Sequence, residues 1–185
     1  TVPDTGSHTA TGVAVDTEGR PVVGGFFFSP TKSSRMVARF DDAGNLDPTF
    51  TASGELVDSD GETNALALQP DEKVVVVGRD IKNPTGSVVR RHSGDGSPDL
   101  GFGTASFTTL GIPTNSVLSS VALSGNKIVV AGTNYATSVD PVVARLTPAG
   151  AMDSFGTAGI ATYDLGGVEK TTSLVVLADG KIVLG

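Results

Sequence analysis

The sequence lacks cysteine and tryptophan, contains only two histidines, and has an aromatic fraction of 5%. The absence of cysteine excludes a disulfide framework and a thiolate metal site. It is compatible with the cytosol and with bacterial export without disulfides. We find no signal peptide and no apolar run near the ~18 residues of a membrane-spanning helix. The chain starts at TVPDTG without Met, as expected of a trimmed, exported protein.

Positive charge is also scarce. The chain has 13 Lys and Arg against 20 Asp and Glu, which gives a formal net charge of -7. An acidic protein is repelled by phosphate backbones and anionic lipid heads, so we expect neither nucleic-acid binding nor membrane insertion. The charged fraction of 18% is too low for a polyelectrolyte tail.

What the chain does contain is a repeat. A basic residue opens each Val- or Ile-rich run, with spacings of 53, 54 and 54 residues, at Arg20, Lys73, Lys127 and Lys181. Two further series, Gly44, Gly96, Gly150 and Asp47, Asp99, Asp153, have spacings of 52 and 54 residues. Independent landmarks with one period indicate a repeat architecture.

Each repeat predicts four short strands. An alternating apolar strand is followed by a tight turn, a Val/Ile run, a variable loop, a third strand such as MVARF, a Gly/Asp turn and a weaker strand such as ELVDS. This pattern predicts an all-β, β-propeller-type array of about three and a half four-stranded antiparallel blades. We treat 1–185 as one repeat region, with repeats near 12–64, 65–118 and 119–172 and a partial repeat at 173–185.

The sequence leaves open how the propeller closes, because closed propellers have about 4–8 blades and this chain has only about three and a half. The array is expected to be a fragment of a longer propeller, a partial view of one, or half of a pair of chains that complete each other. Exposed strand edges promote aggregation, so something is expected to cover them.

The motifs ALALQPDEKVVVVG (65–78), KIVVAG (127–132), ARFDDAGNLDPTF (38–50) and ARLTPAGAMDSFGTAG (144–159) resemble the delta-60 repeat, a bacterial β-propeller-type repeat. The resemblance extends over essentially the whole chain. The second repeat departs from it with VRRH, and the first lacks Gly after Phe50. The resemblance implies a large secreted or surface-exposed protein, and it assigns no catalytic residue.

The most regular polar pattern is an Arg–Asp pair eight residues apart. It occurs three times, as Arg39 with Asp47, Arg91 with Asp99, and Arg145 with Asp153. Across a hairpin turn such a pair fixes the hairpin through charge-assisted hydrogen bonds, so we predict a structural role; a repeated ring of ligands is the alternative. Gly44, Gly96 and Gly150 are assigned to the same turns.

The acidic turn at 41–47 suggests a calcium loop, but its Gly comes too early and the equivalent turns lack the acids. We therefore predict no metal and no cofactor. The sequence also lacks the motifs of hydrolases, metalloproteases and nucleotide-binding enzymes, so no catalytic residue is assigned.

Arg90 and His92 break the repeat, because the equivalent positions of the other two repeats are apolar. Burying an unpartnered Arg is costly, so this face either lies open to solvent or meets an acidic partner. These two residues are the candidate ligand-binding residues, and an exposed face at a repeat irregularity is the alternative.

From these features we expect a non-enzymatic, exported, extracellular or cell-surface bacterial protein that acts as a binding, adhesion or assembly scaffold for a protein or glycan. Specificity would lie in the variable loops near 29–34, 80–87 and 133–141. One alternative is a structural subunit of a filament or matrix that self-associates through blade edges. The other is a propeller hydrolase or lyase with carboxylates at the central channel.

Overall fold

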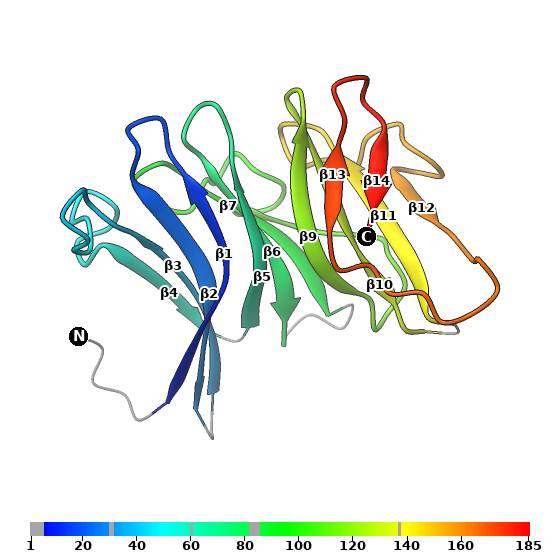
Figure 1. Ribbon diagram of the computed structural model, residues 1–185, viewed down its shortest axis with the longest axis horizontal. Helices are drawn as coiled ribbons and strands as arrows, with labels where there is room; N and C mark the ends of the chain where they lie inside the picture. The colour runs from blue at the N-terminus through cyan, green and yellow to red at the C-terminus, as the bar shows by residue number, and fades with distance from the viewer. Residues whose placement is uncertain (1–5, 30–31, 60, 82–85, 137) are drawn as a thin grey trace.

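The computed structural model describes residues 6–29, 32–59, 61–81, 86–136 and 138–185. Within these residues, all regular secondary-structure elements are β-strands. The strands form three four-stranded antiparallel sheets and one two-stranded sheet. Within each sheet, each strand pairs with the strands that are adjacent to it in sequence. Figure 1 shows the sheets side by side in chain order, from the first blade to the hairpin at the C-terminus. The predicted all-β, propeller-type array is confirmed, and it is a partial propeller.

The first blade contains β1 (Ser7–Val15), β2 (Pro21–Ser29), β3 (Lys32–Arg39) and β4 (Glu55–Ser59). The second contains β5 (Gly61–Leu68), β6 (Val74–Asp80), β7 (Ser87–His92) and β8 (Phe107–Thr109). The third contains β9 (Val117–Ser124), β10 (Lys127–Asn134), β11 (Asp140–Leu146) and β12 (Ile160–Thr162), and the fourth unit is the hairpin of β13 (Leu174–Val176) and β14 (Ile182–Leu184). The described residues contain no apolar helix of the length that a bilayer span requires.

In the second and third blades, the Val- and Ile-rich runs become second strands that are buried on both faces. Val74 to Val77 in β6 are at most 2% exposed, and Ile128 to Ala131 in β10 are fully buried. Three apolar clusters result, one between each pair of neighbouring units. Neighbouring units therefore provide the core that no single sheet can form alone.

A β-bulge in the first strand of each blade makes a hydrogen bond to the next unit. The three bulge residues are Thr11, Asn64 and Ser119. Their side chains donate to the backbone carbonyls of Thr63 (2.6 Å), Leu118 (2.8 Å) and Thr171 (2.6 Å). The first strands of all four units are thus linked in series.

The repeated turn glycine packs against the phenylalanine of the preceding blade. Gly44, Gly96 and Gly150 have φ angles of 80°, 80° and 83°, which favour glycine. A Cβ at Gly150 would lie 2.8 Å from Phe102 Cε2, and one at Gly96 would lie 3.3 Å from Phe50 Cζ. Gly44 belongs to the first blade, and no heavy atom lies within 4 Å of its ideal Cβ position.

Gly150→Ala is expected to destabilise the protein more than Gly44→Ala. Both changes place a side chain at positive φ, which costs about 1–2 kcal/mol. Only at position 150 does the new Cβ also overlap the preceding blade, which adds about 1–3 kcal/mol. Urea unfolding of the two variants measures the difference. Equal losses would show that the turn does not pack tightly on Phe102.

Candidate interaction surface on the third blade

Each blade contains a cluster of Arg, Asp and Phe at the turn between its third and fourth strands. The Arg Nε lies 2.8 Å from the Asp Oδ2 in the first two blades and 2.6 Å in the third, in the pairs Arg39–Asp47, Arg91–Asp99 and Arg145–Asp153. Each guanidinium also lies over a ring, at 5.2, 4.6 and 5.0 Å from the centroids of Phe50, Phe102 and Phe155. The structure thus joins the residues that the sequence pairs.

Hydrogen bonds hold the pKa of two of these carboxylates, those of Asp47 and Asp153, well below the usual range. The Thr49 hydroxyl and N–H, together with Arg39, lower the pKa of Asp47 to about 2. Lys127, the Ser154 N–H and Arg145 lower the pKa of Asp153 to about 2. Because their oxygens are engaged by these donors, the turn carboxylates serve the hairpins themselves.

The same cluster reaches across to the next blade. Arg39 Nη1 donates to the carbonyl of Gly94 at 2.7 Å, and Arg91 Nη1 donates to the carbonyl of Pro148. The backbone N–H groups of Thr51 and Gly103 donate to the carbonyls of Asp95 and Ala149, both at 2.8 Å. At each internal interface, therefore, two donors of one blade bind two consecutive carbonyls in the turn of the next.

The third blade carries the same donors without these acceptors. The Arg145 side chain is 23% exposed, against 6% for Arg39 and 8% for Arg91. Among the described residues, no carbonyl accepts a hydrogen bond from the Arg145 guanidinium or from the N–H of Gly156, which follows Phe155. The third blade thus presents the surface that the first two blades bury.

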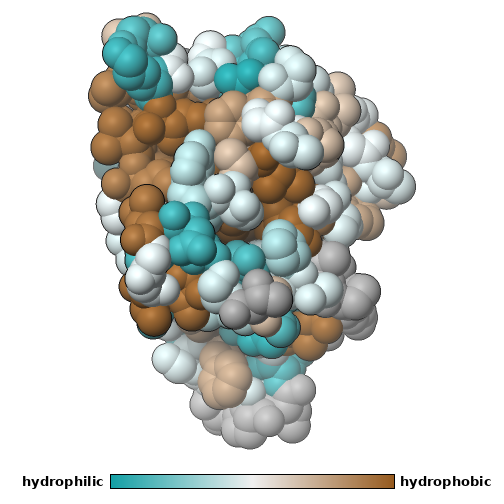
Figure 2. All heavy atoms as spheres, turned by 90° about the vertical axis from the view of Figure 1, so that its right-hand side faces the viewer, coloured by the Kyte–Doolittle hydropathy of each residue, from teal (hydrophilic) through white to brown (hydrophobic). Residues whose placement is uncertain are grey.

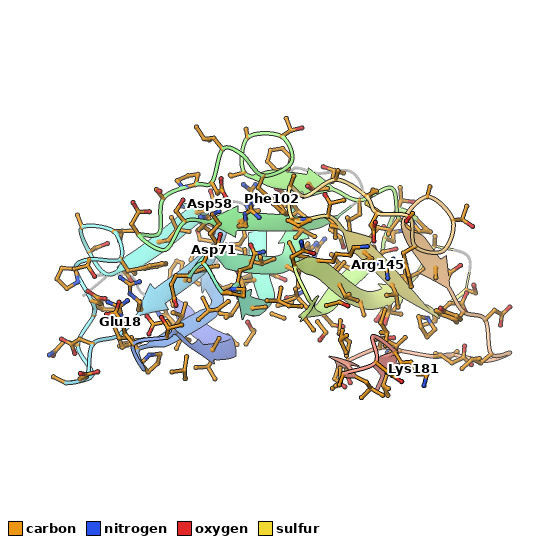
Figure 3. The ribbon with its side chains drawn as sticks, turned by 90° about the horizontal axis from the view of Figure 1, so that it is seen from above. Glu18, Asp58, Asp71, Phe102, Arg145 and Lys181 are labelled. Carbon is orange, nitrogen blue, oxygen red and sulfur yellow. The ribbon has the colours of Figure 1, made fainter. Side chains whose placement is uncertain are left out.

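This surface lines a cleft of about 710 Å³ between the third blade and the β13–β14 hairpin. Figure 3 shows Arg145 on the third blade and Lys181 on the hairpin at the same end of the array. The cleft walls combine aromatic and apolar side chains, among them Val143, Phe155, Tyr163 and Leu165, with three cationic residues, Arg145, Lys170 and Lys181. We call this region the third-blade face.

Exposed apolar side chains surround the cleft. Tyr163 is 47% exposed and Leu165 is 76% exposed on the segment after β12, and Val183 of β14 is 50% exposed. Figure 2 looks onto this end of the array and shows brown apolar patches separated by polar residues. Exposed apolar patches bordered by polar residues are typical of interaction sites.

The hairpin also has a free backbone edge. In each blade the second strand pairs on both sides, whereas β14 pairs only with β13 within the described residues. The apolar side chains of Ile182 and Leu184 already pack with Phe155, as Val74 and Val76 do with Phe50. In the part of the chain that the structure describes, the fourth unit consists of β13 and β14 and has no equivalent of the third strand and its turn.

Arg90 and His92 lie between the first two blades rather than at the third-blade face. Arg90 Nη2 donates to Asp80 at 3.0 Å, and its Nη1 lies 3.6 Å from Asp58 of the first blade. Arg35 of the first blade donates to the same Asp58 at 3.2 Å. The acidic groups facing Arg90 are therefore internal to the array, and a ligand-binding role for Arg90 and His92 stays a prediction.

Parts of the predicted recognition loops, at 30–31, 82–85 and 137, lie outside the described residues. The bulge hydrogen bonds and the cross-blade contacts of the Arg side chains were not predicted. The spacings of 53 and 55 residues between Thr11, Asn64 and Ser119 follow the repeat and are a sequence signal, but three different residue types obscure it.

His92 makes stability pH-dependent. It is 5% exposed, and burial, followed by the charges of Arg90 and Arg35, lowers its pKa from 6.5 to about 4. Between these values the unfolded chain binds the proton that the folded chain excludes. The His92 contribution should therefore lower stability by on the order of 3 kcal/mol as the pH drops from about 6.5 to 4, and this contribution does not grow further below pH 4. Urea unfolding across this range measures the loss.

The matched control is His92→Leu, because Leu146 occupies the equivalent position in the third blade. This variant should lack the loss of stability between pH 6.5 and 4. An identical pH profile in both proteins would assign the effect to other groups.

Two segments of the chain, residues 69–102 and 125–155, match a family described as "Domain of unknown function (DUF5122) beta-propeller". Each segment runs from the turn before a second strand to the Phe of the Arg–Asp–Phe cluster. None of the curated proteins matches the sequence. With the three four-stranded sheets, the match identifies a β-propeller-type repeat protein.

Proposed function

We propose that this repeat region is a non-enzymatic assembly scaffold whose third-blade face binds a strand-and-turn segment of the same repeat type. The observation that carries the proposal is the repetition of the interface. The first two blades use the same Arg, the same Phe and the same N–H group to hold a strand and its turn.

The chemistry of the partner follows from those two interfaces. A strand would pair with the free edge of β14, which is β-strand addition. Its turn would place a glycine on the Phe155 ring, as Gly96 and Gly150 do on Phe50 and Phe102. The two carbonyls before that glycine would accept from Arg145 and from the Gly156 N–H.

Two further parts of the proposal have their own support. The absence of enzymatic activity is supported by the engagement of the turn carboxylates in ion pairs with Arg and Lys. An exported, cell-surface location is supported by the resemblance of the repeats to the delta-60 family.

Self-association is a second candidate, because the first blade offers the complementary surface. Within the described residues, no heavy atom lies within 4 Å of the ideal Cβ position of Gly44, and no donor binds the carbonyls of Asp42 and Ala43 in its turn. When two different surfaces of one protein bind each other, the copies associate head to tail. Such contacts form a ring if the rotation between neighbouring copies closes, and an open filament if it does not.

The test uses a fluorescein-labelled peptide with the sequence of 142–150, VVARLTPAG, titrated into the protein. Binding should saturate, and Phe155→Ala should weaken it at least about tenfold, since loss of a buried aromatic contact commonly exceeds ~1.4 kcal/mol. The matched control is Phe28→Ala, an exposed Phe of the first blade. A peptide with Val in place of the turn glycine should bind more weakly.

Light scattering over a dilution series separates the two candidates. A constant monomer mass with saturable peptide binding supports the partner proposal. Mass that grows with concentration and that Phe155→Ala abolishes would assign the face to a second copy. Absence of peptide binding in a constant monomer would refute both.

A further inference from the structure

Three carboxylates converge beside the third-blade face. Asp140 at the start of β11, Asp164 and Glu169 each offer one oxygen, and these oxygens all lie within 4.8 Å of one another. Asp164 and Glu169 lie on the segment that connects β12 to the hairpin. No described Lys or Arg forms an ion pair with any of the three.

Two of these acids hold buried oxygen atoms without a partner. Asp140 is only 6% exposed, and its Oδ1 has no hydrogen-bond partner. Glu169 Oε2 is likewise buried and unpartnered. Burying an ionised carboxylate without a partner is strongly unfavourable, and clustering three negative charges adds repulsion. A bound cation would remove both costs.

The backbone holds the two segments in place. A parallel bridge joins Val139 to Val168, and the Glu169 N–H donates to the Val139 carbonyl at 2.8 Å. One oxygen of Asp140 accepts from the Ser138 hydroxyl, and Asp164 Oδ1 accepts the Gly166 N–H at 2.8 Å. Each aspartate is thus oriented through one oxygen, while its other oxygen makes no hydrogen bond to a described residue.

A glycine makes room for the third carboxylate. A Cβ at Gly167 would lie 2.8 Å from Glu169 Oε1, so a side chain there would displace the carboxylate. The feature is also specific to the third repeat. Asp140 is replaced by Ser34 and Gly86 at the equivalent positions, and the corresponding connection in the second blade, residues 110–116, contains no acid.

The geometry points to a calcium-binding site formed by Asp140, Asp164 and Glu169. An all-oxygen set of carboxylates suits a hard divalent cation. Calcium–oxygen distances of about 2.3–2.6 Å allow two ligands to lie up to about 5 Å apart, which matches the cluster, whereas magnesium at about 2.1 Å requires a tighter one. Water and backbone carbonyls supply the remaining ligands.

The two tyrosines of the chain provide a direct probe. Tyr163 precedes Asp164, Tyr135 lies on the loop before Asp140, and the chain has no Trp. Terbium(III) replaces calcium and emits when a nearby tyrosine is excited. We expect sensitised emission from one ion per chain, displaced by calcium more effectively than by magnesium. Calorimetry of chelator-treated protein should give a calcium Kd of about 10⁻⁵–10⁻³ M.

Variants separate a built site from a general effect of negative charge. Asp164→Asn and Glu169→Gln should each weaken calcium binding at least tenfold. Asp42→Asn, in the acidic turn of the first blade, removes the same charge and should leave binding unchanged. Asp140→Asn should abolish binding and, in the presence of chelator, melt at or above the wild-type temperature because repulsion is relieved.

The proposal is overturned if calcium gives no heat and no terbium displacement, or if Asp42→Asn weakens binding as much as Glu169→Gln. It is also overturned if the melting temperature of the wild type is the same in calcium and in chelator. None of these measurements involves the peptide or Phe155, so their failure is distinct from failure of the assembly proposal.

Discussion

The structure depends on one contact, the packing of a glycine turn against the Arg and Phe of the preceding blade. The guanidinium stacks on the ring, pairs with the Asp of its own hairpin and donates across the interface, as Arg39 does to Gly94. A nearly buried Arg needs all of these partners, because an unpaired charge there would be costly. Each hairpin is therefore complete only when a neighbouring turn covers it.

This dependence gives the array two different ends. Among the residues that the structure describes, the turn at Gly44 in the first blade packs on no Arg–Phe pair, and Arg145 and Phe155 of the third blade receive no such turn. The contact between the third and fourth units is half formed. The bulge hydrogen bond from Ser119 to Thr171 is present and β14 packs on Phe155, but the cross-blade bond of Arg145 is missing.

Local offsets within a repeat were readable from the sequence, because Arg, Gly, Asp and Phe keep their spacing and the apolar runs identify buried strands. Contacts between repeats were not. VRRH indicated a charged break, yet its partners come from Asp80 and from Asp58 of the preceding blade. The acids at Asp140, Asp164 and Glu169 belong to no periodic series, and only a backbone bridge between distant segments brings them together. The only calcium loop that the sequence suggested was the acidic turn at 41–47, and the aligned repeats argued against it.

The proposed calcium site and the proposed docking face share a wall. Pro141, Tyr163 and Glu169 line the cleft, and the same segments carry the three acids. An ion that binds Asp164 and Glu169 would restrict the segment between β12 and the hairpin, so a partner strand would lose less conformational freedom on docking. Linkage then requires the reverse effect, in which a docked strand tightens calcium binding by the same factor. The irregular acids of the third repeat would thus make assembly at the end of a regular array responsive to calcium.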